Sequence, residues 1–225
     1  MKKFNILLSL CLFVFACTPR VDDVFDEQSA IRVQEEIDRV DEILNSATNG
    51  WIMYYYANPN YGGYNLRCVF NGDNTVTVNS EIDPAEQETS HYKFEQSQGV
   101  VLSFDEYNSL FHYFSDPKNP DGVGSNGQGM LGDFEFRVLS ATQEKVVLKG
   151  KKHDSIIEMY AAADDFEWST YMAEVGAVET AMMSKKYFLT FGEKTVIALK
   201  SNRALEFLDE ESQSTITIPF IFNEK

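Results

Sequence analysis

Short segments in which apolar and polar residues alternate recur along much of the chain. In residues 64–70, for example, Leu66, Cys68 and Phe70 fall on one side of an extended backbone, and Asn65 falls on the other. A period of two is that of a β-strand with one buried face. This repeated pattern restricts the chain to a mainly β fold, in which the helices cover or flank sheets.

About eight such strands are expected before residue 163. Turn sequences separate them, among them Asn71-Gly72, which is typical of a hairpin. Closely spaced short strands predict an antiparallel barrel or sandwich, of a lipocalin-like kind. A barrel of about eight strands just holds side chains or one small ligand. The expected strands are 51–57, 64–70, 75–78, 92–95, 100–104, 134–138, 145–149 and 155–160.

Two helices are expected beside these strands, one within 24–47 and one over 164–183. Both show apolar residues at helical spacing, such as Val33, Ile37 and Val40 in the first. About four more strands follow the second helix, and Pro219 in the last of them indicates an edge strand. The fold class is therefore α+β. A first domain is predicted over 24–163, and an incomplete second unit over 164–225.

The first residues have the pattern of a secretory signal peptide. Lys2 and Lys3 precede an apolar run from Phe4 to Phe15, which is too short for a membrane-spanning helix of about 20 residues. A small residue followed by Cys17 is typical of a bacterial lipobox. We therefore expect a signal peptide over 1–16, acylation of Cys17, and a tether over 17–23. The expected location is the outer membrane, on its cell-surface or periplasmic face.

Charge and cysteine content limit the partners and the chemistry. Loss of residues 1–16 leaves 17 basic against 35 acidic residues, a net charge of −18. Such an excess argues against nucleic acid as a partner. Once Cys11 is removed and Cys17 acylated, Cys68 is the one cysteine left, so no internal disulfide can form. Cys68 is interpreted as a buried, inert thiol.

Five stretches of the chain are characteristic when they are taken together. They are 49–53 (Asn-Gly-Trp-Ile-Met), 62–65 (Gly-Gly-Tyr-Asn), 101–105 (Val-Leu-Ser-Phe-Asp), 112–117 (His-Tyr-Phe-Ser-Asp-Pro) and 146–152 (Val-Val-Leu-Lys-Gly-Lys-Lys). With them, the chain resembles the domain-of-unknown-function 4302 family of Bacteroidetes lipoproteins, from about residue 24 to the C-terminus. The resemblance implies an outer-membrane lipoprotein, often encoded near glycan- or nutrient-uptake genes, and it supplies no catalytic residues. It also implies that members run on well past a stretch like 218–222, so that this chain, which ends at residue 225, is expected to be either a truncated or a naturally short member.

No metal site or cofactor is expected, because metal-ligating and phosphate-binding motifs are absent. The three histidines are far apart in sequence, and no HExxH, CxxC or P-loop pattern occurs. Residues 116–122 begin like a calcium-binding loop, but Lys118 occupies a ligand position and no Glu closes the loop. No catalytic residue is assigned. A hydrolase that uses a pair of carboxylates is the alternative, since such a pair is defined by space and not by sequence.

The best candidate site is the aromatic region around the first expected turn. Exposed rings can stack on sugars and asparagines can bond hydroxyl groups, although core packing accounts for at least half of the rings. The candidate ligand-binding residues are Tyr56, Asn58, Asn60 and Tyr61, and Tyr61 is the ring expected to be most exposed. The expected function is a non-catalytic binding or accessory lipoprotein, anchored in the membrane through Cys17. Its ligand would be a glycan, a small apolar molecule in the barrel, or an outer-membrane protein; a protein-interaction or structural surface module is the other alternative.

Overall fold

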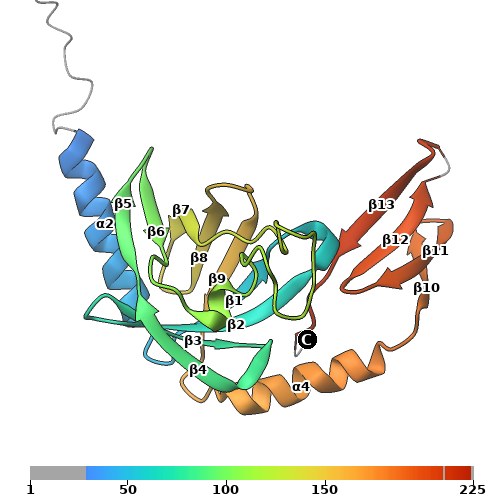
Figure 1. Ribbon diagram of the computed structural model, residues 1–225, viewed down its shortest axis with the longest axis horizontal. Helices are drawn as coiled ribbons and strands as arrows, with labels where there is room; N and C mark the ends of the chain where they lie inside the picture. The colour runs from blue at the N-terminus through green and yellow to red at the C-terminus, as the bar shows by residue number, and fades with distance from the viewer. Residues whose placement is uncertain (1–28, 210, 224–225) are drawn as a thin grey trace, which may run out of the picture. The chain divides into compact units, whose positions relative to one another are not determined.

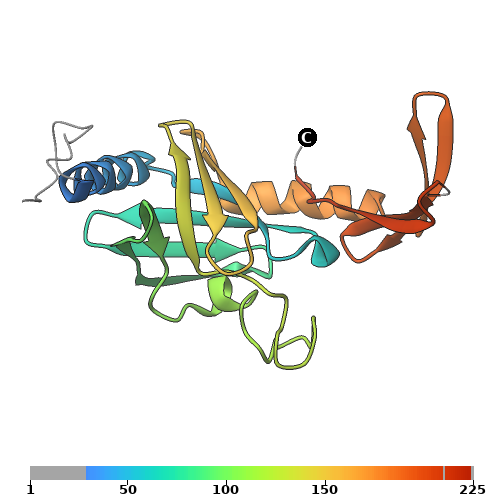
Figure 2. The same cartoon turned by 90° about the horizontal axis from the view of Figure 1, so that it is seen from above.

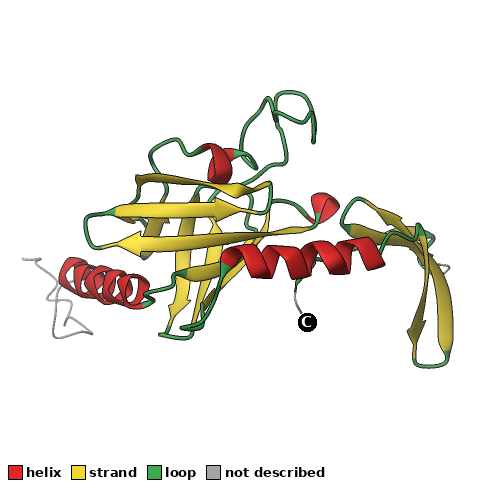
Figure 3. Ribbon diagram, turned by 90° about the horizontal axis from the view of Figure 1, so that it is seen from below, coloured by secondary structure: helices red, strands yellow, loops and turns green. Residues whose placement is uncertain are grey.

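The computed structural model describes residues 29–209 and 211–223. Strands make up most of the regular secondary structure in this part of the chain (Figure 3). The expected signal peptide, the tether and Cys17 lie outside the described residues. The chain divides into two compact units, residues 1–32 and residues 33–225, and the features below belong to the second. The boundary at residue 163 between the two predicted domains, 24–163 and 164–225, stays a prediction.

Nine strands form one antiparallel sheet that curls into a half-barrel (Figure 1). Its order is β4-β3-β2-β1-β9-β8-β7-β6-β5, so most neighbours in the sheet are also neighbours in sequence. The pairing of β1 with β9 joins the first strand to the last. The strands are β1 (Trp51–Tyr56), β2 (Gly63–Asn71), β3 (Thr75–Ser80), β4 (Asp83–His91), β5 (Lys93–Gln96), β6 (Val100–Ser103), β7 (Glu135–Ala141), β8 (Lys145–Gly150) and β9 (Ile156–Ala161).

A single residue, Tyr92, separates the two strands at the ends of this sheet. On one side of Tyr92, β4 pairs with β3, and on the other side β5 pairs with β6. Counted as one bent strand, β4 and β5 give the eight strands that the sequence predicts. The prediction missed β4 itself, because Asp83–His91 is polar and its side chains are mostly exposed, so no apolar alternation marks it.

The inner face of the curled sheet is filled with aromatic and aliphatic side chains. Tyr55 contacts the rings of Phe111, Phe114 and Phe136, and Phe104 stacks on Phe111 with 3.9 Å between ring centroids. Two helices contribute side chains to this core. The short helix α3 (Ser109–His112) adds Leu110 and Phe111, and the longer helix α2 (Ser29–Ser46) adds Val40 and Leu44. The Trp51 indole donates a hydrogen bond to the Leu44 carbonyl at 2.9 Å, which joins α2 to β1.

A helix covers part of the outer face of the sheet. This helix, α4 (Trp168–Ala181), begins and ends inside the range expected for it. It lies beside β4 in Figure 1, and Figure 2 shows it from above. Trp168, Tyr171 and Val175 are buried with Ile52, an outward residue of β1, and with Phe222. The expected apolar face of the second helix is thus confirmed as a second, smaller core.

The last strands form a separate four-stranded antiparallel sheet in the order β10-β11-β12-β13. Its edge strand β13 ends at Pro219, which confirms the expectation of an edge. Several of its large apolar side chains are exposed, among them Phe188 and Phe191. The strands are β10 (Lys186–Phe191), β11 (Lys194–Ser201), β12 (Ala204–Asp209) and β13 (Ser214–Pro219).

A buried polar network ties this second sheet to the first. The Arg203 guanidinium pairs with Glu81 and donates a hydrogen bond to the Gly63 carbonyl at 2.9 Å. The side chains of Arg203 and Glu81 are 11% and 6% exposed. The backbone at Gly62, whose φ is +69°, comes so close to Arg203 that a Cβ on residue 62 would overlap Arg203. Only glycine therefore fits at this position. The turn η2 (Pro59–Tyr61) lies just before this contact.

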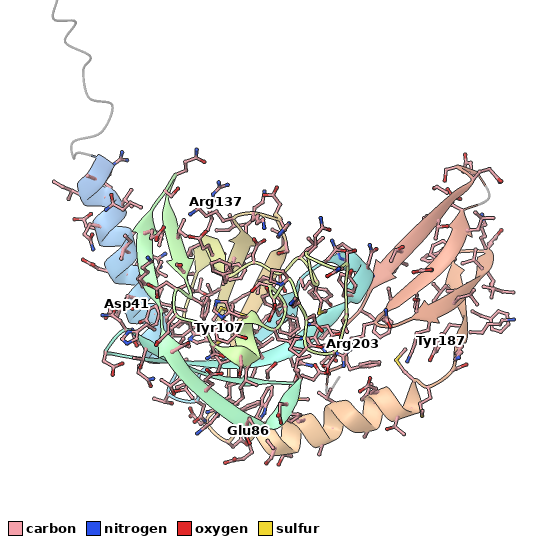
Figure 4. The ribbon with its side chains drawn as sticks, viewed as in Figure 1. Asp41, Glu86, Tyr107, Arg137, Tyr187 and Arg203 are labelled. Atoms are coloured by element: carbon pink, nitrogen blue, oxygen red, sulfur yellow. The ribbon has the colours of Figure 1, made fainter. Side chains whose placement is uncertain are left out.

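We predict that Glu81→Ala lowers the free energy of unfolding by about 3–5 kcal/mol. The change removes the buried carboxylate from the buried Arg203 cation and leaves this cation with Glu179, which is 3.8 Å away and 51% exposed. Urea unfolding followed by circular dichroism measures the change. Glu86→Ala, an exposed carboxylate on β4 labelled in Figure 4, is the matched control and should stay within about 0.5 kcal/mol of the wild type. Equal stabilities of the two variants would show that the ion pair is dispensable.

Candidate functional site

The outer face of the nine-stranded sheet carries a cleft of about 750 Å³, which we call the tyrosine cleft. This volume is within the range of small-molecule sites, about 300–1,000 Å³. Strands β1 and β9, the connection to α4, α4 itself and the C-terminal segment all contribute to it. The lining residues are Ile52, Tyr54, Tyr160, Ala161, Ala162, Ala163, Asp165, Phe166, Glu167, Thr170, Tyr171, Glu174 and Asn223.

Strand alternation and strand pairing place the floor of the tyrosine cleft. Odd positions of β1, such as Tyr55, face the core, so Ile52 and Tyr54 face outward. Because Ile52 pairs with Tyr160 across β1 and β9, Tyr160 points to the same side. The Tyr54 and Tyr160 rings lie 5.4 Å apart between centroids. Two half-buried tyrosine rings therefore form one continuous aromatic surface.

A polar clamp holds the Tyr160 ring in place. Its hydroxyl donates to a Glu158 oxygen at 2.6 Å, and the Lys145 ammonium bonds the other Glu158 oxygen at 2.7 Å. The same ammonium lies 5.0 Å from the centre of the Tyr160 ring. The hydrogen bond from Lys145 lowers the pKa of Glu158, and the hydrogen bond to Glu158 raises the pKa of Tyr160. The phenol therefore stays protonated and oriented.

Most polar groups that line the tyrosine cleft have made no bond within the described part of the chain. The carboxylates of Asp165, Glu167 and Glu174 are exposed and accept no side-chain hydrogen bond or ion pair there. The hydroxyl groups of Tyr54 and Thr170 likewise donate to no described residue. Such groups are available to a ligand at no cost in internal hydrogen bonds. The exceptions are Tyr160, which Glu158 holds, Tyr171, whose hydroxyl donates to Asn65 at 2.7 Å, and Asn223, which is also engaged.

The residues chosen from the sequence do not line this cleft. Asn58 caps the turn η2 by accepting a hydrogen bond from the Asn60 backbone N–H at 3.0 Å. Tyr61 is only half-buried and packs against the main core. Tyr56 is half-buried on the same outward side as Tyr54, and burial, its largest influence, raises its pKa. The structure thus groups Asn58, Asn60 and Tyr61 in one turn.

Tyr61 does line a smaller pocket of about 300 Å³. Tyr64, Val123, Glu179, Asn202 and Arg203 complete its walls. The Arg203 guanidinium lies 4.3 Å from the centre of the Tyr64 ring, so its charge is already engaged by that ring and by Glu81. The expected aromatic site therefore corresponds to a junction between the two sheets.

Asn65, which the alternation in 64–70 places outward, is fully buried and serves the fold. Its amide donates to Glu81 and to the Phe222 carbonyl, each at 2.7 Å, and it accepts from Tyr171. No group of three or more histidine, cysteine or acidic side chains among residues 29–209 and 211–223 is placed to hold a metal ion. No described helix is long and apolar enough to cross a membrane.

The sequence patterns do not identify Tyr160, the carboxylates or Phe166 as members of the tyrosine cleft. One signal could have found the first of these. In an up-and-down barrel the first and last strands pair, so an outward tyrosine in each predicts neighbouring rings. The other lining residues come from the connection to α4 and from its exposed turns. Their position depends on how α4 packs, which no local pattern encodes.

The comparisons with known proteins place the chain in a family. Residues 21–225 match the family described as Domain of unknown function (DUF4302). The chain belongs to this family. The resemblance noted in the sequence is thereby confirmed, and the match covers all of the described residues. No curated protein and no solved structure matches the chain.

We predict that Cys68 reacts with a thiol reagent only when the protein unfolds. The side chain is fully buried, and burial raises the pKa of its thiol to about 12. At pH 8 the folded protein therefore holds almost no thiolate, the reactive form. Colour development with Ellman's reagent, with and without denaturant, measures this. Rapid labelling of the native protein would contradict the burial of Cys68.

Proposed function

We propose that the protein is a lipid-anchored, non-catalytic binding protein of the outer membrane, and that its tyrosine cleft takes a glycan. The observation that carries the proposal is the pair of half-buried rings, Tyr54 and Tyr160, beside hydroxyl and carboxylate groups without internal partners. Aromatic faces stack on the apolar faces of sugars, and the free oxygens accept hydrogen bonds from sugar hydroxyls.

The anchor is supported by the sequence that precedes the described residues. Lys2 and Lys3, a short apolar run and the small residue before Cys17 have the order of a lipoprotein signal. One acyl chain binds membranes only reversibly, whereas two or more hold a protein firmly. A multiply acylated Cys17 would therefore keep the binding domain at the membrane.

The filled interior of the curled sheet favours a glycan on the outer face over a small apolar molecule inside. Tyr55, Phe104, Phe111, Phe114 and Phe136 occupy the space that such a molecule would need. A close-packed interior admits a ligand only if side chains move, at a cost in packing energy. The tyrosine cleft, by contrast, is open to solvent as it stands.

A protein-interaction module is the second candidate, favoured by the exposed side chains of the four-stranded sheet. Phe188 is 70% exposed, and Ile197, its partner in the strand pairing, is 52% exposed. Exposed apolar patches mark interaction surfaces in soluble proteins. These side chains indicate no particular partner chemistry, so the tyrosine cleft carries the proposal.

We predict that Tyr54→Ala and Tyr160→Ala each weaken glycan binding about tenfold, since loss of one stacked ring costs about 1 kcal/mol or more. A glycan array finds the ligand, and titration calorimetry measures the affinity. Tyr107→Ala is the control, because this ring is 62% exposed and lies outside the cleft (Figure 4). Equal losses of glycan affinity in all three variants would show that the cleft is not the binding site. Cleavage of the bound glycan into shorter sugars would contradict a non-catalytic role.

We predict that Cys17→Ala abolishes incorporation of labelled palmitate and shifts the protein from the membrane fraction to the soluble fraction. The substitution removes the only thiol at the expected processing site, so no acyl chain can be attached. Cys11→Ala is the matched control within the signal peptide and should leave labelling unchanged. Palmitate incorporation into the Cys17→Ala variant would overturn the anchor.

A further inference from the structure

The charge of the tyrosine cleft narrows the kind of sugar that it can hold. We propose that the cleft selects glycans that carry free amino groups over neutral or acidic glycans of the same size. This inference rests on the proposed glycan-binding function and adds a substrate class to it. The juxtaposition that carries it is a pair of tyrosine rings framed by three carboxylates and by no lysine or arginine among the lining residues.

The carboxylates have no cation to neutralise them. Asp165, Glu167 and Glu174 are exposed and form no ion pair within the described part of the chain. Two cations lie against lining rings, Lys145 at 5.0 Å from the Tyr160 ring and Arg67 at 5.9 Å from the Phe166 ring, but neither pairs with these carboxylates. Lys145 pairs with Glu158, and Arg67 donates to the Asn49 carbonyl at 2.8 Å. An ammonium group in the cleft gains charge-assisted hydrogen bonds, whereas a sugar carboxylate or sulfate is repelled.

The rings add to the same preference. A cation within about 6 Å of a tyrosine face is attracted by the quadrupole of the ring, by about 0.5–1 kcal/mol at an exposed site. The Tyr160 ring already accepts one such contact, from Lys145 at 5.0 Å. Tyr54 has no cation over its ring within the described residues. The Tyr54 ring therefore offers a face for a ligand ammonium group as well as for a sugar ring.

The charge of the whole chain acts in the same direction. The formal net charge is −16 for the complete sequence, so the protein field slows the approach of anions and favours that of cations. A field of this kind is screened over about 8–10 Å at physiological salt. A charge-selected ligand should therefore bind less tightly as salt is raised, and a neutral ligand should not respond.

Titration calorimetry of the acylated, detergent-solubilised full-length protein tests the inference with four probes. These are a glucosamine tetramer, an N-acetylglucosamine tetramer, a galacturonic acid tetramer and spermidine. We expect the glucosamine tetramer to bind at least tenfold more tightly than the other two sugars at low salt. Spermidine, which has the charge without the sugar rings, should bind more weakly than the glucosamine tetramer.

Two variants and a control assign the preference to the cleft. Glu174→Gln and Asp165→Asn should each weaken binding of the glucosamine tetramer about three- to fivefold, as expected for exposed charge pairs. Glu86→Gln, an exposed carboxylate on β4, should not change it. Circular dichroism confirms that each variant is folded. Equal effects of the three substitutions would mean that net charge, and not the cleft, sets the affinity, which would overturn the inference.

The outcomes separate this inference from the proposed function. If the N-acetylated tetramer binds as tightly as the free amine, the charge preference is wrong and the glycan-binding proposal stands. If spermidine binds as tightly as the glucosamine tetramer and depends on the same carboxylates, the cleft recognises amines and not sugars, and both fail. If no sugar on the array or in the titrations binds, the glycan-binding proposal fails and takes the inference with it.

Discussion

Asn65 points away from the core of the nine-stranded sheet, yet none of its side chain is exposed. A buried amide must satisfy its hydrogen bonds internally or destabilise the fold. Asn65 meets this condition through Glu81, the Phe222 carbonyl and the Tyr171 hydroxyl. These partners come from three distant parts of the sequence. One amide therefore joins both α4 and the C-terminal segment to the outer face, where the smaller apolar core also holds them.

The tyrosine cleft depends on the same constraint. Tyr171 donates to Asn65 and also lines the cleft, and Asn223 lines it directly after Phe222, whose carbonyl Asn65 holds. The backbone continues this docking, because Gly63 donates to the Phe220 carbonyl at 2.9 Å. The aromatic floor belongs to paired strands of the nine-stranded sheet, whereas the wall belongs to α4, the connection before it and the C-terminal segment, which the smaller apolar core and a few polar bonds hold on the outer face. The rings on the strands form the stacking surface, and the carboxylates of the wall form its rim.

Local patterns predict the elements that a single period defines. The alternation in 64–70 predicts β2, and the apolar spacing after Trp168 predicts the buried face of α4. Strand β4 escapes prediction because its residues are polar on both faces, and only its pairing with β3 makes it a strand. Asn65 shows the other limit. Alternation places its side chain on the outer face of the sheet, but α4 and residue 222 cover that face there, so the side chain is buried.

The site differs from its sequence prediction for a related reason. Composition alone identifies Asn58, Asn60 and Tyr61 as polar and aromatic, but it does not say whether their bonding capacity is already used. The structure shows that Asn58 caps a turn and that Tyr61 packs on the core. Tyr54 is a tyrosine like Tyr61, but its hydroxyl donates to no described residue, because its outward position on β1, next to β9, leaves it facing the cleft. A polar group binds a ligand where the fold has left it unsatisfied and exposed, and that property belongs to tertiary packing.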